Sequence, residues 1–199
     1  MNRALKIVVA DDELDMRDYF QQILPLLGHQ VLGVARTGRE LVDLCAATHP
    51  DLVITDIKMP DMDGIDAATQ IYRQAAIPVI LVSAYHDAEF IRRAEADHIM
   101  AYLVKPIKQA DLEPAIGIAM RRFEQFQALR KETADLKQAL EDRKVIEKAK
   151  GILMKKTGLD EHDAFRRLQK LASDKNRKLI DIAQMILIAE EAVQPPAKC

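Results

Sequence analysis

Five side chains that could together carry out phosphoryl-transfer chemistry each follow or close a short apolar segment of the sequence. Asp11 and Asp12 follow the first segment, Asp56 closes the third, and Ser83 and Lys105 close two later ones. A carboxylate nucleophile, a hydroxyl group and a cation are the parts needed to accept a phosphoryl group covalently. Three neighbouring carboxylates would raise at least one pKa unless a divalent cation neutralises them, and Mg²⁺ suits such a set of oxygen ligands. Each residue alone is common as a helix cap, so the joint placement carries the prediction.

The elements that must position these groups alternate between strands and helices over the first 110 residues. Most strand segments are continuously apolar, as in parallel strands covered on both faces; they are Leu5–Ala10, Val31–Ala35, Leu52–Thr55, Val79–Val82 and Ala101–Val104. The segments between them have helical periodicity, namely Leu14–Leu27, Gly38–His49, Gly64–Gln74, Asp87–Glu95 and a helix from Gln109 onward. This alternation predicts an α/β fold with a flavodoxin-like, five-stranded parallel sheet of order 2-1-3-4-5. In that order the first and third strands are neighbours, so the candidate groups meet at the carboxyl ends of the strands.

Four motifs in the first half of the chain resemble the receiver domains of two-component response regulators. The motifs are VVADDE, LVITDIKMPDMDG, ILVSA and AYLVKP, which begin at Val8, Leu52, Ile80 and Ala101. The resemblance covers residues 1–120. It departs from the family at Ala94–Met100, which lacks the glycine usual in the turn before the fifth strand.

The resemblance to receiver domains implies a role for each candidate residue. Asp56 would accept a phosphoryl group from a sensor histidine kinase. Mg²⁺ would be bound by Asp12, Asp56 and the backbone carbonyl of Lys58, while Asp11 would assist through a water molecule. Two further residues, Ser83 and Lys105, would hold the phosphoryl oxygens. Tyr102 matches the aromatic residue that turns inward when the domain is phosphorylated.

A long helix is expected to leave the first domain, because no proline or glycine interrupts residues 118–150. Apolar residues recur there at spacings of three and four, which is typical of a heptad-like seam; they are Leu112, Ile116, Ala119, Phe123, Phe126, Leu129, Leu136 and Leu140, with Thr133 interrupting the series. We interpret residues 121–136 as a coiled-coil linker that pairs with a second copy of the chain when Asp56 is phosphorylated. The alternative is a lone helix packed against its own C-terminal domain.

Residues 137–192 are expected to form three amphipathic helices, followed by a flexible tail at 193–199. Between residues 143 and 178 there are 12 Lys and Arg against 5 Asp and Glu, a net charge of +7. On a helical wheel, one arc of the first helix is basic and contains a glycine; its candidate nucleic-acid-binding residues are Arg143, Lys144, Lys148, Lys150, Gly151 and Lys155. A glycine there costs about 1 kcal/mol relative to alanine, and it would let a phosphate backbone or a base approach closely. A solvated lysine face with an incidental glycine is the alternative.

These C-terminal residues also resemble a known family. The segments Arg143–Met154, Gly158–Ala172 and Leu179–Ile186 are similar to the ANTAR domain, an RNA-binding output module of transcription antitermination regulators. The resemblance implies that a dimer binds hairpin RNA in nascent transcripts. Asp160 is expected to cap the second helix, which would carry Phe165 on its apolar stripe.

Two other functions remain open from the sequence, a DNA-binding response regulator and a phosphorylation-dependent adaptor for proteins. A DNA-binding helix-turn-helix would place its basic residues later in the bundle, whereas the third helix here bears mostly Leu, Ile and Ala. The chain of 199 residues has a net charge of −2 and two cysteines. Its longest apolar run, Ala75–Ala84, is about half of what a membrane-spanning helix needs. We therefore expect a cytoplasmic protein without a signal peptide or a membrane partner.

Overall fold

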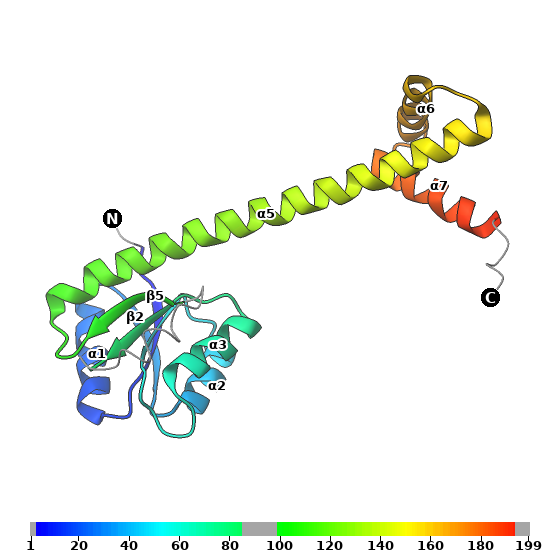
Figure 1. The fold of residues 1–199 in the computed structure, drawn as a ribbon. Coiled ribbons are helices and arrows are strands. Elements are labelled where there is room, and N and C mark those ends of the chain that lie inside the picture. The colour runs from blue at the N-terminus through cyan, green and yellow to red at the C-terminus, as the bar shows by residue number, and fades with distance from the viewer. Residues whose placement is uncertain (1–2, 85–98, 194–199) are drawn as a thin grey trace. The chain divides into compact units, whose positions relative to one another are not determined.

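The computed structural model describes residues 3–84 and 99–193 (Figure 1). The expected helix Asp87–Glu95, most of the stretch Ala94–Met100 and the tail beyond Val193 lie outside the described residues. The chain divides into two compact units, residues 1–127 and 128–199.

The first unit contains the expected five-stranded parallel sheet in the order β2-β1-β3-β4-β5. Its strands are β1 (Lys6–Ala10), β2 (Gln30–Ala35), β3 (Leu52–Asp56), β4 (Val79–Ser83) and β5 (Ile99–Val104). The helices that accompany them are α1 (Leu14–Leu26), α2 (Gly38–Thr48), α3 (Gly64–Gln74) and the beginning of α5 (Gln109–Thr157). The fold class and strand order predicted from the sequence are confirmed.

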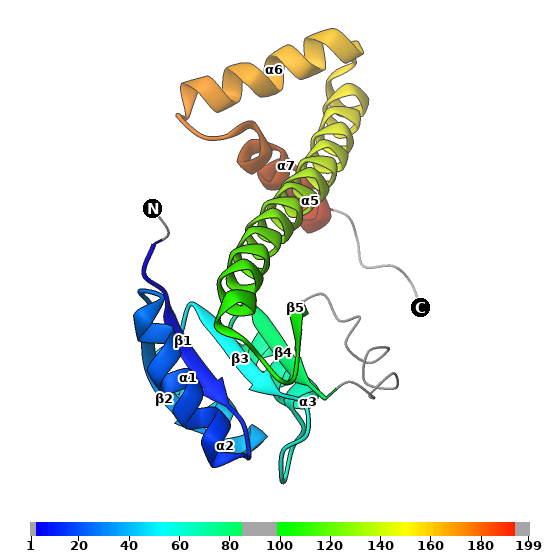
Figure 2. The same cartoon turned by 90° about the vertical axis from the view of Figure 1, so that its left-hand side faces the viewer.

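Each face of the sheet is covered by helices, which explains why its strands are continuously apolar (Figure 2). Alternate residues such as Ile7, Val9 and Ile54 pack with α1 and the first turns of α5. Their neighbours, such as Val8 and Val53, pack with α2 and α3 on the other face. Both sets are buried, because successive side chains of a strand point to opposite faces.

Short polar side chains cap the first turns of α2 and α3. The Thr37 hydroxyl accepts a hydrogen bond from the Glu40 N–H at the start of α2, at 3.2 Å. The Asp63 carboxylate accepts one from the Asp66 N–H at the start of α3, at 2.8 Å. Such side chains satisfy N–H groups that have no partner within the helix. They fix where each helix starts, and so where the loop before it must run.

The second unit is a three-helix bundle formed by the end of α5, by α6 (Glu161–Asp174) and by α7 (Leu179–Val193). Its buried core consists of Ala149, Leu168, Ala172, Ile182 and Ala183. As expected, α5 ends just before Gly158, whose φ is +71°, and Asp160 caps α6 by accepting from the Asp163 N–H at 2.8 Å. The expectation for Phe165 is wrong, since its side chain is 37% exposed and lies outside the core. The buried stripe on α6 is narrower than the sequence suggested and consists of Ala164, Leu168 and Ala172.

The apolar seam along α5 divides into two parts. Leu112, Ile116 and Ala119 are buried in the core of the first unit, and the two phenylalanines that follow pack against the same core. Further along, three leucines are mostly uncovered, at 62%, 65% and 56% exposure; they are Leu129, Leu136 and Leu140. The free seam is therefore shorter than the sequence pattern indicated.

Candidate phosphorylation site and nucleic-acid interface

A cavity of about 180 Å³ opens at the carboxyl ends of the strands. Its lining includes five of the predicted site residues together with Glu13, and consists of Asp12, Glu13, Asp56, Ile57, Lys58, Ser83, Ala84 and Lys105. Asp11 lies directly behind it and is fully buried. The fold thus brings the residues singled out from the sequence to one place.

The carboxylates converge because β1 and β3 are hydrogen-bonded neighbours, with Ala10 beside Thr55 in the register. One carboxylate oxygen of each of Asp11, Asp12 and Glu13 lies within 4.8 Å of the others. Asp56 closes β3 and is only 7% exposed. Burial raises the pKa of Asp56 to about 6; the charge of Lys105 opposes this rise, and that of Asp11 adds to it. The pKa of Asp11 is also raised by burial.

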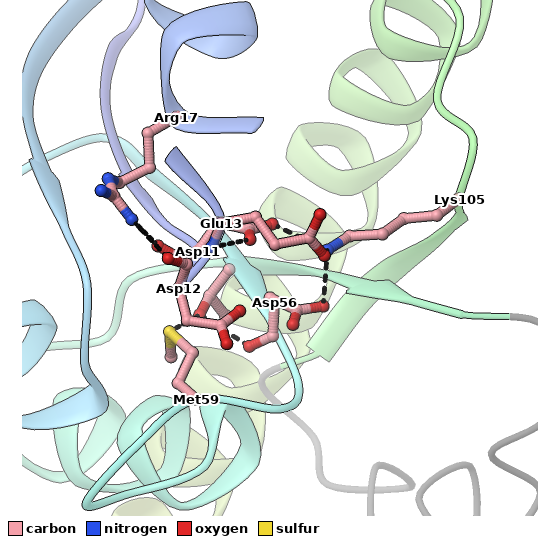
Figure 3. Close-up of polar contacts among 8 residues, drawn as sticks. Asp11, Asp12, Glu13, Arg17, Asp56, Met59 and Lys105 are labelled. Atoms are coloured by element: carbon pink, nitrogen blue, oxygen red, sulfur yellow. Dashed lines mark hydrogen bonds and ion pairs between the residues drawn. The ribbon is translucent and has the colours of Figure 1, made fainter. Parts of the chain in front are cut away.

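Lys105 is the cation among these acids (Figure 3). Its Nζ atom lies 3.1 Å from Asp11 Oδ2, 3.0 Å from Glu13 Oε1 and 3.6 Å from Asp56 Oδ1. Burial alone would lower the pKa of Lys105, but hydrogen bonds to Glu13 and Asp11 and the charge of Asp56 outweigh it, so the pKa is raised. One ammonium group therefore serves three carboxylates, and the negative charge of the cavity is only partly neutralised.

Two glycines hold the loop between β3 and α3 from both ends. A Cβ atom on Gly64 would lie 2.0 Å from the carbonyl oxygen of Asp56. A Cβ atom on Gly38 would lie 2.4 Å from the carbonyl oxygen of Met62. Real Cβ atoms do not approach a backbone oxygen so closely, so both positions need glycine. The loop that carries Lys58 is thereby fixed against its neighbours.

The other two predicted residues of this site, Ser83 and Tyr102, do not reach Asp56 in this structure. The Ser83 hydroxyl lines the cavity and donates to the carbonyl of Ala84, at 2.9 Å. Tyr102 is exposed on β5. Lys105 precedes Pro106 through a cis peptide bond.

The basic residues of the second unit divide into two groups. Arg143, Lys144, Lys148 and Lys155 are exposed, and the first three line one hollow together with Leu140 and Glu147. Nothing lies within 4 Å of where a Cβ atom on Gly151 would be, so its hydrogen faces open space, as expected.

Lys150 differs from the prediction. Only 7% of it is exposed, because its Nζ atom lies 2.6 Å from Glu147 Oε2 and 2.8 Å from Glu161 Oε1. Glu161 is the first residue of α6. The carboxylate of Glu161 from α6 and that of Glu147 from α5 thus both cover Lys150, and its assignment to an exposed basic arc is wrong.

Known proteins share both units. A family model of the response regulator receiver domain matches residues 7–117, and one of the ANTAR domain matches residues 134–187. The transcriptional regulatory protein PdtaR of Mycobacterium tuberculosis is 40% identical over 182 residues, which covers 92% of this chain and 89% of that protein. The chain belongs to the response regulators that carry an ANTAR domain.

Another regulatory protein and two solved receiver domains are similar to parts of this ANTAR regulator. The transcriptional regulatory protein HptR of Staphylococcus aureus is 35% identical over 118 residues, which is 58% of this chain and 46% of that protein. A receiver domain from Clostridium thermocellum has 30% identity and a TM-score of 0.56, and covers 61% of this chain and 98% of its own. A CheY-like receiver domain from Methanospirillum hungatei has 26% identity and a TM-score of 0.57, with coverages of 62% and 98%.

The family and its relatives settle the class of function. A receiver joined to an ANTAR domain makes this chain a phosphorylation-controlled regulator of transcription antitermination, a regulatory protein rather than an enzyme. Among the helices that the structure describes, none has the length and apolarity to cross a membrane.

Two residues of the receiver site received no role from the sequence. Glu13 belongs to the quoted VVADDE motif, and its place as the third of three consecutive acids was the available signal. Gly64 ends the quoted LVITDIKMPDMDG motif, but only the fold shows that it packs on the carbonyl of Asp56.

Proposed function

We propose that Asp56 is the phosphoacceptor of this ANTAR regulator and that a sensor histidine kinase supplies the phosphoryl group. The observation that carries the proposal is a buried carboxylate with its pKa raised to about 6 in a cavity that also presents an ammonium group and a hydroxyl group. An Asp56 oxygen would attack the phosphorus of a phosphohistidine. The new O–P bond forms as the P–N bond breaks, and the imidazole leaves with the electron pair and takes up a proton.

Mg²⁺ fits the donor set of this cavity. The clustered carboxylates of Asp11, Asp12 and Glu13, with Asp56 beside them, offer oxygen ligands to a hard cation, and Lys105 alone does not balance their charge. We assign Asp12, Asp56 and the Lys58 carbonyl as ligands, with Asp11 acting through water. The bound ion would supply positive charge to the transferring phosphoryl oxygens.

Lys105 and Ser83 would hold the phosphoryl oxygens once the bond to Asp56 has formed. Lys105 needs only to exchange one of its carboxylate partners for a phosphoryl oxygen, because its Nζ atom already lies 3.6 Å from Asp56. The Ser83 hydroxyl would turn from the Ala84 carbonyl toward the new group. Tyr102 would then turn inward from its exposed position.

Labelling of the full chain by acetyl phosphate with Mg²⁺ tests the receiver chemistry. The Asp56→Asn variant should take up no label, and Asp12→Ala should lose nearly all uptake. Lys105→Ala should still take up some label but should no longer pass the signal to the output. Full labelling of the Asp56→Asn protein would show that the phosphoacceptor lies elsewhere.

We also propose that hairpin RNA binds the exposed basic face of the ANTAR domain. This face comprises Arg143, Lys144, Lys148, Gly151 and Lys155, and no longer includes the covered Lys150. Exposed lysine and arginine side chains can neutralise phosphates, while the bare backbone at Gly151 allows close approach of a loop nucleotide.

A gel shift over a range of salt concentrations, with hairpin RNA and duplex DNA as competing probes, tests this interface. Preference for the hairpin, with a strong fall of affinity as salt rises, is the expected result. Preference for the duplex would favour a DNA-binding regulator, and binding of neither would favour a protein adaptor. Because the proposed ligand is a nascent transcript, we place the protein in the cytoplasm.

Phosphorylation is proposed to act through pairing of two chains along the exposed seam. We assign phosphorylation to residues 1–120, pairing to 121–136 and RNA binding to 137–192. The uncovered Leu129, Leu136 and Leu140 offer an apolar stripe to a partner. With Leu129 and Leu136 at d positions, Glu132 takes a g position and Lys137 the next e position.

The charges beside the seam favour a second copy of the chain in parallel orientation. In a parallel, in-register pair a g side chain faces the next e side chain of the other chain, so Glu132 would face Lys137 of the second copy. An antiparallel pair would bring together e positions, which are the basic Arg130, Lys137 and Lys144. Sedimentation with and without beryllofluoride tests the pairing. A constant mass alongside tighter RNA binding would exclude it.

A further inference from the structure

The acidic turn Asp11–Glu13, which follows β1, is bound on its side toward α1 by a buried arginine. Arg17 lies in the first turns of α1 and is 8% exposed. Its Nη1 atom donates to the carbonyl oxygen of Asp11 at 2.7 Å and to that of Asp12 at 2.8 Å. Figure 3 shows both bonds leaving the same terminal nitrogen. The Nη1 atom of Arg17 thus binds the backbone carbonyls of two consecutive residues, Asp11 and Asp12, whose carboxylates belong to the acidic cluster at the cavity.

This arrangement is unusual for a buried cation. Burying a charge is costly unless it is paired, and buried arginines usually pair with carboxylates. In the described part of the chain, however, the Arg17 hydrogen bonds go to these two backbone carbonyls and not to a carboxylate. The charge of Arg17 also acts through space on Glu40, whose pKa it helps to lower. The guanidinium is therefore bound to the backbone of the acidic turn, and it is well placed to fix the shape of that turn.

The remaining polar atoms of Asp11 are also fixed. Its N–H donates to the carbonyl of Ala35 at 3.2 Å, and its Oδ1 accepts from the Glu13 N–H at 3.0 Å. Its Oδ2 faces Lys105 at 3.1 Å. Asp12 has fewer restraints, because its carboxylate is exposed at the cavity. The carbonyl bond to Arg17 is the contact that holds the Asp12 backbone.

We propose that Arg17 is a positioning residue for the Mg²⁺ ligands, which orients the Asp11 and Asp12 carboxylates through their own backbone. The proposal rests on the Mg²⁺ site proposed above. By binding both carbonyls on the side toward α1, Arg17 keeps the two side chains on the side toward Asp56. Arg17 touches neither the ion nor the phosphoryl group, so its effect on them passes through the turn.

Two physical effects of removing Arg17 have opposite signs, which makes the proposal testable. Loss of a positive charge near the cavity would by itself tighten the binding of a cation. Loss of the two hydrogen bonds would loosen the ligands and weaken binding. Residues that orient metal ligands typically contribute roughly 10–100-fold to metal affinity. We expect the second effect to dominate.

The experiment measures the affinity of the full chain for Mg²⁺ by calorimetry, and for Mn²⁺ by electron paramagnetic resonance. In Arg17→Met, which keeps much of the side-chain bulk, the affinity for either ion should fall roughly tenfold, which is the low end of that range. Hydrogen exchange at the Glu13 amide should also become faster in the metal-free protein. Arg36→Met, which removes an exposed arginine, should change neither quantity.

Two further variants separate this proposal from the one on which it rests. Asp12→Asn should abolish binding of either ion; if it does not, the metal site itself is misassigned. If Asp12→Asn abolishes binding while Arg17→Met binds Mg²⁺ as tightly as the unaltered chain or more tightly, Arg17 has no positioning role. Should Arg17→Met fail to fold, Arg17→Lys is judged by the same criterion, because the lysine side chain is shorter and its ammonium group does not reach the place of Arg17 Nη1.

Discussion

Replacement of Asp56 by asparagine is expected to stabilise the receiver domain at neutral pH, although it removes the proposed phosphoacceptor. The fold raises the pKa of this carboxyl from its ordinary value of 3.8 to about 6, chiefly because the group is buried. The ionised form is therefore less favourable in the folded chain than in the unfolded chain. The interval between the two values corresponds to roughly 3 kcal/mol, at about 1.36 kcal/mol for each pH unit. Asparagine keeps the shape without the charge, so most of this cost should disappear.

The sign of the pH dependence follows from the same pair of values. Below pH 3.8 the carboxyl is protonated in both states, and the Asp56→Asn variant should gain nothing. The gain should grow as the pH rises and should be complete above about pH 6, where the folded carboxyl is ionised. Near pH 5 roughly half of the full gain is expected.

Urea unfolding followed by tyrosine fluorescence measures this gain in the receiver domain alone. The chain has no tryptophan, and its four tyrosines all lie within the first 102 residues. Asp43→Asn, a charge removal at an exposed position of α2, is the matched control and should leave stability unchanged. Added Mg²⁺ should narrow the difference by stabilising the ionised form. An Asp56→Asn protein no more stable than the parent at pH 7.5 without divalent ions would refute this account of the site.

Three other predictions concern positions outside the carboxylate cluster. Gly64→Ala should lower the free energy of unfolding by roughly 3 kcal/mol in urea titrations, because its Cβ would meet a backbone oxygen. Gly117→Ala, in open space on α5, should instead raise the free energy of unfolding by about 0.5–1 kcal/mol. Equal effects of the two substitutions would contradict the packing argument. Lys148→Ala should weaken hairpin RNA binding and flatten its salt dependence without changing the melting temperature, while Lys150→Met should lower the melting temperature of the bundle. Leu136→Ala should reduce the mass change caused by beryllofluoride in sedimentation without altering labelling by acetyl phosphate; an unchanged dimer would exclude the seam.

The strands could be predicted closely from the sequence because burial on both faces makes them continuously apolar. Four of the five begin and end within one residue of the predicted bounds, and β5 begins two residues earlier, at Ile99. The convergence of Asp11, Asp12, Asp56 and Lys105 followed from the strand order. For the strands, the local sequence pattern and the sheet topology predict the same arrangement, so the structure differs from the prediction only at the strand ends.

Residues that depend on contacts between distant elements could not be predicted in the same way. A helical wheel treats a helix as isolated, so it placed Lys150 with its exposed neighbours, whereas Glu161 from the next helix covers it. Phe165 was assigned to the core by its spacing alone. Arg17 gives no local signal, because its partners are backbone carbonyls, which every residue possesses.

The two glycine contacts that hold the loop between β3 and α3 also affect the entropic cost of binding a ligand. Gly38 presses on Met62 and Gly64 on Asp56, so both ends of the loop are fixed by bare backbone. Ordering a flexible loop costs about 1–2 kcal/mol of conformational entropy per residue. In this chain that entropy is lost when the domain folds, before any ion or phosphoryl group arrives. If the Lys58 carbonyl binds the ion as proposed, it does so from a loop whose two ends are already ordered, so that part of the ordering cost does not reduce the free energy of binding.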